Sequence, residues 1–209
     1  MQKIMKLAKL LIATTNPAKF REYMALLKGL PFEVVSLKDS KIKREVKEDG
    51  KTFEENAIKK AKFYSKLTDL PTLADDGGLE IDCLNGEPGV NSRYWPGYRA
   101  TDQELIDLTL RKMKGIPWEK RRAKLRIVLA LAISPKKIFT AESEIKGLIT
   151  TKPKRLIPGY PFRSIFYLPK LKKVYSELSF KEEVEIGHRK KAVQKIIPIF
   201  LKLEILNQC

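Results

Sequence analysis

The stretch "LLIATTNPAKF", Leu10 to Phe20, joins an apolar run to a polar segment that contains a proline. The apolar run predicts a buried strand that ends near Thr14. Asn16 is a favoured helix N-cap, and Pro17 suits the first helical position because its missing N–H needs no partner there. The stretch therefore predicts a strand that leads directly into a helix, which we expect to run to about Lys28.

The rest of the chain continues to mix strands with helices. Strands are expected at 32–37, 73–74, 79–84, 125–133 and 139–149, and helices at 52–67, at 100–115 and from 188 onward. Thr52 and Glu55 have the spacing of a capping box, and Pro198 should kink or divide the last helix. The irregular order of the elements favours a mixed α/β sheet over a doubly wound one. Because no repeat or linker interrupts residues 1–209, we expect one domain.

The chain is strongly basic, with 42 Lys and Arg against 25 Asp and Glu and a net charge of +17. Such a charge favours a polyanionic partner, either nucleic acid or nucleotide phosphates. The basic residues are scattered, with only small clusters at Lys120–Arg126 and His188–Lys191. Any affinity for nucleic acid is therefore expected to be non-specific.

The sequence favours a cytoplasmic protein without a membrane anchor. The apolar run Ile127–Ile133 is too short to span a bilayer, and Lys6 and Lys9 interrupt the N-terminal apolar stretch as an export signal would not. Two cysteines, Cys83 and Cys209, provide neither a disulfide framework nor the spacing of metal ligands.

The stretch "LADDGGL", Leu73 to Leu79, places two carboxylates before two glycines. Side chains in a strand alternate, so Asp75 and Asp76 should point to opposite faces unless the backbone turns between them. Glycine permits φ > 0 and the close approach of another group, so we expect a tight turn beside a ligand. A solvated hairpin turn is the alternative that this stretch leaves open.

Two further segments carry groups that suit phosphate and metal. In "TTNPAK", the N–H groups at the helix start attract phosphate, and Lys19 opposes the helix dipole as if an anion lay between them. An ordinary N-cap with a surface lysine explains these residues equally well. Glu48, together with Asp75 and Asp76, offers oxygen ligands for Mg²⁺, although Glu48 alone fits an exposed loop charge better.

Near the C-terminus, the segments "PGYPFRSIF" (158–166) and "EIGHRKKA" (185–192) combine aromatic and basic residues. Aromatic side chains in a Pro/Gly-rich loop can form a stacking wall for a base. His188 and Arg189, at a helix start, can both donate hydrogen bonds. The alternative is that the aromatic residues belong to the core and His188 is a cap.

Six segments, taken in order, resemble the inosine triphosphate pyrophosphatase family. They are "TTNPAKFRE", "EDGKTFEENAIKKA", "LADDGGLEID", "GEPGVNSRYWPGYRATD", "EKRRAKLRIVLALA" and "GHRKKA". The resemblance spans about Leu10 to Ile196. It implies a single elongated α/β domain in which a mixed sheet, flanked by helices, separates two lobes, and it implies a homodimer. It also implies Mg²⁺-dependent hydrolysis of non-canonical purine nucleoside triphosphates, such as ITP, dITP and XTP, to the monophosphate and pyrophosphate.

The same resemblance assigns roles to residues. Asp76 matches the proton acceptor and metal ligand, and Glu48 matches the second metal-site carboxylate. The implied substrate contacts are Thr14, Thr15, Asn16, Lys19 and Lys60 for the phosphates, Gly77 through its backbone, and Tyr160, Phe162, Arg163, Glu183, His188 and Arg189 on the base side.

Several positions depart from the family pattern. Gly77 and Gly187 replace serines, Arg163 replaces an aspartate and Glu183 replaces a lysine. If the last two side chains meet, the acid and the base have exchanged places as a unit, and we expect poor discrimination between inosine and the standard nucleotides. The alternative is that both residues are solvent-exposed and unrelated. A pyrophosphatase with altered base preference and a basic, non-catalytic nucleic-acid-binding protein on the same fold are the alternative functions.

Overall fold

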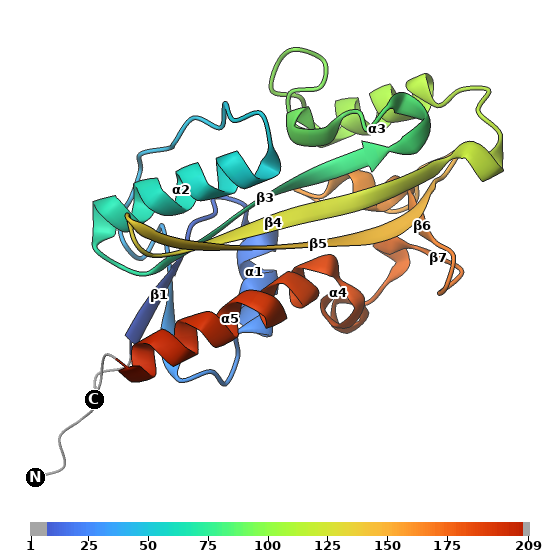
Figure 1. Ribbon diagram of the computed structural model, residues 1–209. Coiled ribbons are helices and arrows are strands. Elements are labelled where there is room, and N and C mark those ends of the chain that lie inside the picture. The colour runs from blue at the N-terminus through green and yellow to red at the C-terminus, as the bar shows by residue number, and fades with distance from the viewer. Residues whose placement is uncertain (1–7, 207–209) are drawn as a thin grey trace, which may run out of the picture. The chain divides into compact units, whose positions relative to one another are not determined.

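The computed structural model describes residues 8–206, with side chains described through residue 202, so Cys209 lies outside the described residues. Figure 1 shows the course of the chain. The strands of the described part are β1 Ala8–Ile12, β2 Phe32–Ser36, β3 Thr72–Ile81, β4 Arg122–Ser134, β5 Lys137–Ile149, β6 Phe166–Leu168 and β7 Lys173–Val174. The α-helices there are α1 Pro17–Leu26, α2 Phe53–Thr68, α3 Asp102–Lys112, α4 Phe180–Ile186 and α5 His188–Leu206.

The sheet is mixed, as the irregular order of elements predicts. Its strand order is β2-β1-β3-β4-β5-β6-β7. Strand β1 pairs in parallel with both β2 and β3, whereas β6 pairs antiparallel with both β5 and β7. The expected α/β class with a mixed sheet and flanking helices is confirmed.

The described chain divides into two compact units. The first contains the residues up to Asp76, Val128–Ala141 and those from Lys191 onward, and the second contains Gly77–Ile127 and Glu142–Lys190. We call these the first unit and the second unit. The expectation that residues 1–209 form one domain stays a prediction.

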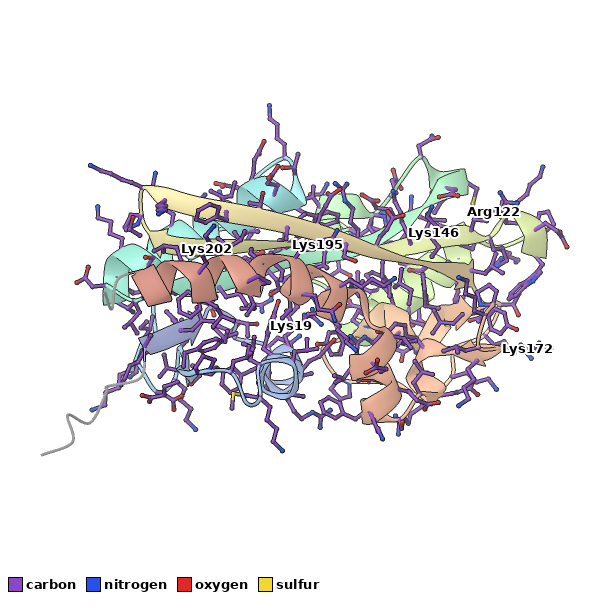
Figure 2. The ribbon with its side chains drawn as sticks, turned by 60° about the horizontal axis from the view of Figure 1, so that its bottom comes forward. Lys19, Arg122, Lys146, Lys172, Lys195 and Lys202 are labelled. Atoms are coloured by element: carbon purple, nitrogen blue, oxygen red, sulfur yellow. The ribbon has the colours of Figure 1, made fainter. Side chains whose placement is uncertain are left out.

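In the first unit, β1 leads through α1 to β2 on one side, and α2 returns the chain to β3 on the other side of β1. Because crossovers between parallel strands are right-handed, this order places α1 and α2 on opposite faces of the sheet. Figures 1 and 2 show α2 on one side of the strands and α1 and α5 on the other. Phe200 of α5 packs edge-on against Phe32 of β2, with ring centroids 5.0 Å apart.

The second unit has its own apolar core beneath α3. Leu105 and Ile106 of α3 pack there with Ile81 of β3 and Phe166 of β6. Thr101 caps α3 and forms a complete capping box with Glu104. This core supports the short 3₁₀ segment Pro161–Ile165, which carries several of the predicted base-side residues.

The acidic stretch is not a turn. β3 runs without interruption from Thr72 to Ile81, so the expectation of two strands flanking a turn is wrong. Neither Gly77 nor Gly78 has a positive φ. The two glycines serve close approach within the chain instead, because a Cβ on Gly77 would overlap the carbonyl oxygen of Arg126 and one on Gly78 would overlap the Ser92 hydroxyl.

The helix boundaries agree with the sequence patterns except in detail. Thr52 caps α2 through the Glu55 N–H, but the Glu55 carboxylate accepts from Lys51 N rather than from Thr52, so the expected capping box is incomplete. Pro198 lies inside α5 and does not divide it. No helix in the described part of the chain has the length and hydropathy that a bilayer crossing requires.

The basic residues are spread over many elements. Figure 2 labels Lys19 on α1, Arg122 on β4, Lys146 on β5, Lys172 between β6 and β7, and Lys195 and Lys202 on α5. Basic side chains therefore occur on elements of both units, as the scattered sequence positions indicate.

Candidate active site

The start of α1 is closed by its own cap. The Asn16 side chain accepts from Ala18 N at 2.9 Å and from Lys19 N at 3.3 Å, and Thr14 Oγ1 accepts from Asn16 N at 3.2 Å. The N–H groups that we expected to be free for a phosphate at these three positions are thus already bonded. The acceptors are side chains of the same turn, as is usual for a helix N-cap. Thr15 is exposed beside them.

Lys19 reaches back to β3. Its Nζ lies 3.0 Å from Asp75 Oδ2, and the Asp75 side chain is only 2% exposed. The anion that pairs with Lys19 in this structure is therefore the protein's own Asp75 carboxylate. Lys19 remains partly exposed and close to a predicted phosphate loop.

Asp76 points the other way, toward α2. Its Oδ2 accepts from Asn56 Nδ2 at 3.0 Å, and its Oδ1 lies 3.9 Å from Lys60 Nζ. The same ammonium donates to Glu48 Oε2 at 2.8 Å. The predicted alternation of Asp75 and Asp76 is confirmed, and Lys60 brings Glu48 and Asp76 to one site.

The surroundings of this site shift the pKa values of Asp76 and Lys60. Burial raises the pKa of Asp76 above its ordinary value of 3.8, and the Glu48 charge raises it further, while the Lys60 and Lys19 charges and the Asn56 hydrogen bond oppose the rise. Burial by itself lowers the pKa of the Lys60 ammonium, but Asp76, Glu48 and Asp75 outweigh it and leave that pKa raised. A carboxylate of raised pKa beside a fixed positive charge suits a proton acceptor.

Asn56 is a site residue that the sequence reasoning missed. It lies one helical turn before Lys60, so both side chains lie on the same face of α2. Its amide nitrogen donates to Asp76, while its Oδ1 accepts from Gly50 N at 2.7 Å. Asn56 thereby fixes the Asp76 carboxylate against the segment that carries Glu48. The four-residue spacing from Lys60 was the signal available in the sequence.

The donor set fits a hard divalent cation that is completed by substrate. Mg²⁺ in phosphate-handling enzymes takes one or two protein carboxylates and fills its remaining positions with phosphate oxygens and water. Glu48 and Asp76 provide such a pair, held together by Lys60. Among the described residues, no group of three or more acidic, histidine or cysteine side chains forms a cage of its own.

In the second unit, Arg163 and Glu183 meet. Arg163 Nη1 lies 3.1 Å from Glu183 Oε2, and the two side chains are 4% and 9% exposed. The guanidinium carbon of Arg163 lies 3.7 Å from the centroid of the Tyr160 ring and 4.6 Å from that of the Tyr175 ring. The two side chains thus meet and are buried, so the alternative in which both are solvent-exposed and unrelated is wrong.

The other predicted base-side residues differ in their surroundings. Tyr160 is half-buried, and its hydroxyl accepts from Arg189 Nη1 at 3.3 Å. His188, the first residue of α5, is buried next to Arg189. Phe162 belongs to the apolar core of the second unit, as Phe166 does, so the core alternative applies to both phenylalanines of the segment 158–166.

Asp102, at the start of α3, holds the loop that carries Tyr160. Its Oδ2 accepts from Gly159 N at 2.7 Å, and its Oδ1 accepts from Arg93 Nη1 at 2.8 Å. Gly159 has φ +81°, which a residue with a side chain rarely adopts. No sequence pattern indicates this link, because the residues that it joins lie far apart in the chain.

The sequence profile of the Ham1 family matches residues 10–199. The chain belongs to the Ham1 family. A protein from Geobacter sulfurreducens named dITP/XTP pyrophosphatase is 38% identical to this Ham1 chain over 187 residues, which is 90% of this chain and 94% of that protein. A Bacillus subtilis protein of the same name is 38% identical over 186 residues, with coverage of 89% and 93%.

A solved Ham1 structure agrees with this assignment. The HAM1 protein from Coxiella burnetii matches this Ham1 chain with a TM-score of 0.83 and 31% identity, over 94% of this chain and 100% of that one. The resemblance drawn from the six motifs is confirmed at the level of family and fold. The roles assigned to individual residues remain predictions.

Proposed function

We propose that this Ham1-family chain is a nucleoside triphosphate pyrophosphatase, which hydrolyses ITP, dITP, XTP or related nucleotides to the monophosphate and pyrophosphate with Mg²⁺. The observation that carries the proposal is the bridge from Lys60 to Glu48 and Asp76. It occurs in a chain whose relatives are named dITP/XTP pyrophosphatases. A homodimer and a cytoplasmic location remain expectations.

Different residues of the first unit would accept the proton, neutralise the phosphate charge and hold the metal ion. Asp76, with its raised pKa and its orientation fixed by Asn56, accepts the proton of the attacking water. Lys60 and Lys19 offset the negative charge that the phosphates bring and that grows in the transition state. Glu48 and Asp76 would hold Mg²⁺, which supplies charge neutralisation at the phosphate oxygens when bound.

The roles on the nucleobase rest on the family resemblance, which assigns them to residues of the second unit. Tyr160 offers a partly exposed aromatic ring, and Arg189 fixes the tyrosine hydroxyl. Stacking on such a ring contributes about 1–3 kcal/mol per base. Asp102 supports this role by holding the backbone at Gly159.

Product analysis tests the proposal. The purified protein is incubated with ITP, XTP, GTP or ATP in the presence of Mg²⁺, and separately with excess EDTA, and nucleotides and phosphates are resolved by chromatography. We expect monophosphate and pyrophosphate in equal amounts, and loss of turnover with EDTA. Release of single phosphates through the diphosphate, or no turnover of any of these nucleotides, contradicts the proposal.

The net charge of +17 favours one alternative, a non-catalytic nucleic-acid-binding protein. If the chain is an enzyme with an incidental affinity, its binding to DNA or RNA should be independent of sequence and should fall steeply with salt. Fluorescence anisotropy with labelled oligonucleotides over a salt series measures this. Tight, sequence-selective binding at high salt, together with no turnover, would favour the alternative.

A further inference from the structure

Glu48 lies in a segment that buries little of its own surface. In the described structure, residues 42–50 form a coil between β2 and α2. Residues 43–49 are exposed except for Val46, which is half-buried. A segment with so few buried apolar contacts opens readily unless other elements hold it. The position of the Glu48 carboxylate therefore depends on what fastens this segment to the rest of the first unit.

Tyr64 of α2 fastens the part of the segment that precedes Glu48. Its hydroxyl donates to the carbonyl oxygen of Arg44 at 3.1 Å and accepts a hydrogen bond from the Val46 backbone. The Tyr64 side chain is buried, and its ring packs edge-on against Phe63 with ring centroids 5.0 Å apart. The Arg44 guanidinium carbon in turn lies 5.7 Å from the Phe63 centroid. The ring of Tyr64 is thus fixed within the first unit, while its hydroxyl bonds to the segment.

Side chains at every fourth position of α2 contact every second residue of the segment. The pairs are Tyr64 with Val46, Lys60 with Glu48, and Asn56 with Gly50. Four residues of a helix advance about 6 Å along its axis, and two residues of an extended chain advance about 6.6 Å. Because the two repeats match, the segment follows one face of α2 in the antiparallel direction. Glu48 lies between two anchors, one on each side.

The bond from Lys60 is not enough to hold the segment by itself. The Glu48 side chain is 42% exposed, and an ion pair that is open to solvent contributes little order. The anchors at Tyr64 and Asn56 bind backbone groups instead, so they fix the chain on both sides of Glu48. When a ligating group is in place in only a fraction of the molecules, the apparent affinity for its partner falls by that fraction.

We propose that Tyr64 is a positioning residue for Glu48. Its hydroxyl holds the segment on α2, so that the Glu48 carboxylate is in place before Mg²⁺ and the nucleotide bind. The inference rests on the proposed function, in which Glu48 and Asp76 hold Mg²⁺. Tyr64 itself touches neither the metal ligands nor the phosphates in this role, and it acts only through the backbone of the segment.

Amide hydrogen exchange of the metal-free protein, followed by NMR, tests whether Tyr64 orders the whole segment. Tyr64→Phe removes the hydroxyl and keeps the ring. The amide to follow is that of Gly50, because the change leaves its own bond to Asn56 in place. The loss of one hydrogen bond corresponds to about 2- to 12-fold, and we expect exchange at Gly50 to speed up within this range. Unchanged exchange at Gly50 overturns the inference, because Tyr64 would then order only its direct partners.

The Mg²⁺ dependence of turnover is the second readout. For Tyr64→Phe, the Mg²⁺ concentration at half-maximal pyrophosphate release should rise, by up to the factor measured for exchange, and saturating Mg²⁺ should restore the parent kcat. A half-saturating concentration equal to that of the parent, or a kcat that stays low at saturating Mg²⁺, overturns the inference alone. Failure of the parent protein to turn over any nucleotide overturns the proposed function, and the positioning role with it.

Two further variants separate positioning from a general loss of stability. Tyr94→Phe removes the hydroxyl of an exposed tyrosine in the second unit and should change neither readout. Gly50→Ala disturbs the other anchor, since a Cβ there would lie 2.7 Å from Asn56 Oδ1, and it should raise the Mg²⁺ requirement as Tyr64→Phe does. Melting temperatures show that each variant is folded under the assay conditions. A folded Gly50→Ala protein with the Mg²⁺ requirement of the parent overturns the inference.

Discussion

Lys19 Nζ lies 3.0 Å from the buried Asp75 carboxylate, on the face of β3 opposite to the one where Asp76 approaches Lys60. Two adjacent acidic residues of one strand thus form ion pairs with two different lysines. Asp75 positions Lys19 from α1, while Asp76 lies with Glu48 and Asn56 beside α2. The paired acids are therefore expected to differ in function although they are neighbours in sequence.

Asp76→Asn should abolish turnover and leave the fold intact. The change removes a charge assigned to the metal and to the attacking water, but it is nearly isosteric, and loss of a general base reduces kcat by about 10²- to 10⁴-fold. Steady-state pyrophosphate release measures the activity, and circular dichroism checks the fold. The exposed carboxylate of Asp107 provides a matched control, because Asp107→Asn should retain the parent rate. A rate of pyrophosphate release by Asp76→Asn within a few-fold of the parent rate would contradict the assignment.

Asp75→Asn should act more mildly and mainly on KM. Without the carboxylate, Lys19 loses the partner that holds it toward β3, and a misplaced lysine weakens phosphate binding before it affects proton transfer. We expect KM to rise about 10- to 150-fold, the range of one lost charged hydrogen bond, with a smaller change in kcat. Full kinetics of Asp75→Asn, of Lys19→Met and of the double variant provide the measurement. If Asp75→Asn lowers kcat as far as Asp76→Asn does, the division of roles is wrong.

The Arg163–Glu183 pair should show strong coupling in stability. Arg163→Met or Glu183→Leu alone leaves a buried charge uncompensated and should lower the free energy of unfolding by about 3–5 kcal/mol. The double variant should be far less destabilised than the sum of the two single changes, because no unpaired charge remains. Urea unfolding of the four proteins forms a double-mutant cycle. Additive losses would mean that the two side chains do not interact in solution.

Glu182 should make α4 sensitive to acid. Its carboxylate accepts from Ser179 N and Lys173 Nζ, and these bonds lower its pKa from 4.5 to about 2. A carboxyl with a lower pKa in the folded protein contributes stability above its unfolded pKa and loses that contribution as the pH falls toward the folded value. Glu182→Gln should therefore lower the melting temperature near pH 7, and the difference from the parent should vanish between about pH 5 and pH 2. A difference that stays constant over this range would contradict the assignment.

Local patterns predicted the local structure well. The β1-to-α1 junction follows from Asn16 and Pro17, because capping depends on residues within a single turn. The alternation of Asp75 and Asp76 follows from strand geometry alone. The pairing of Arg163 with Glu183 required the family resemblance, since nothing in the spacing of these residues brings them together.

The turn expected at the glycines and the missed role of Asp102 both concern contacts that are remote in sequence. The two glycines after Asp76 predict a turn in the sequence. In the structure they lie in a continuous strand, and Arg126 and Ser92 occupy the space that their side chains would need. The link from Asp102 to Gly159 is also invisible in the sequence, for the same reason. Sequence patterns record what a residue needs from its neighbours along the chain, and they do not record which distant group fills that need.

The alternation along β3 restricts how this part of the chain can change in length during evolution. Loss or gain of one residue just before Asp75 would turn every later side chain of the strand to the opposite face. Each acid would then face the wrong lysine, and a residue with a Cβ would move into the space beside Arg126 after an insertion, or into the space beside Ser92 after a deletion. A substitution in β3 can have a small or a large effect on activity and stability. A single insertion or deletion would disrupt both the acid–lysine pairs and the close packing at the glycines.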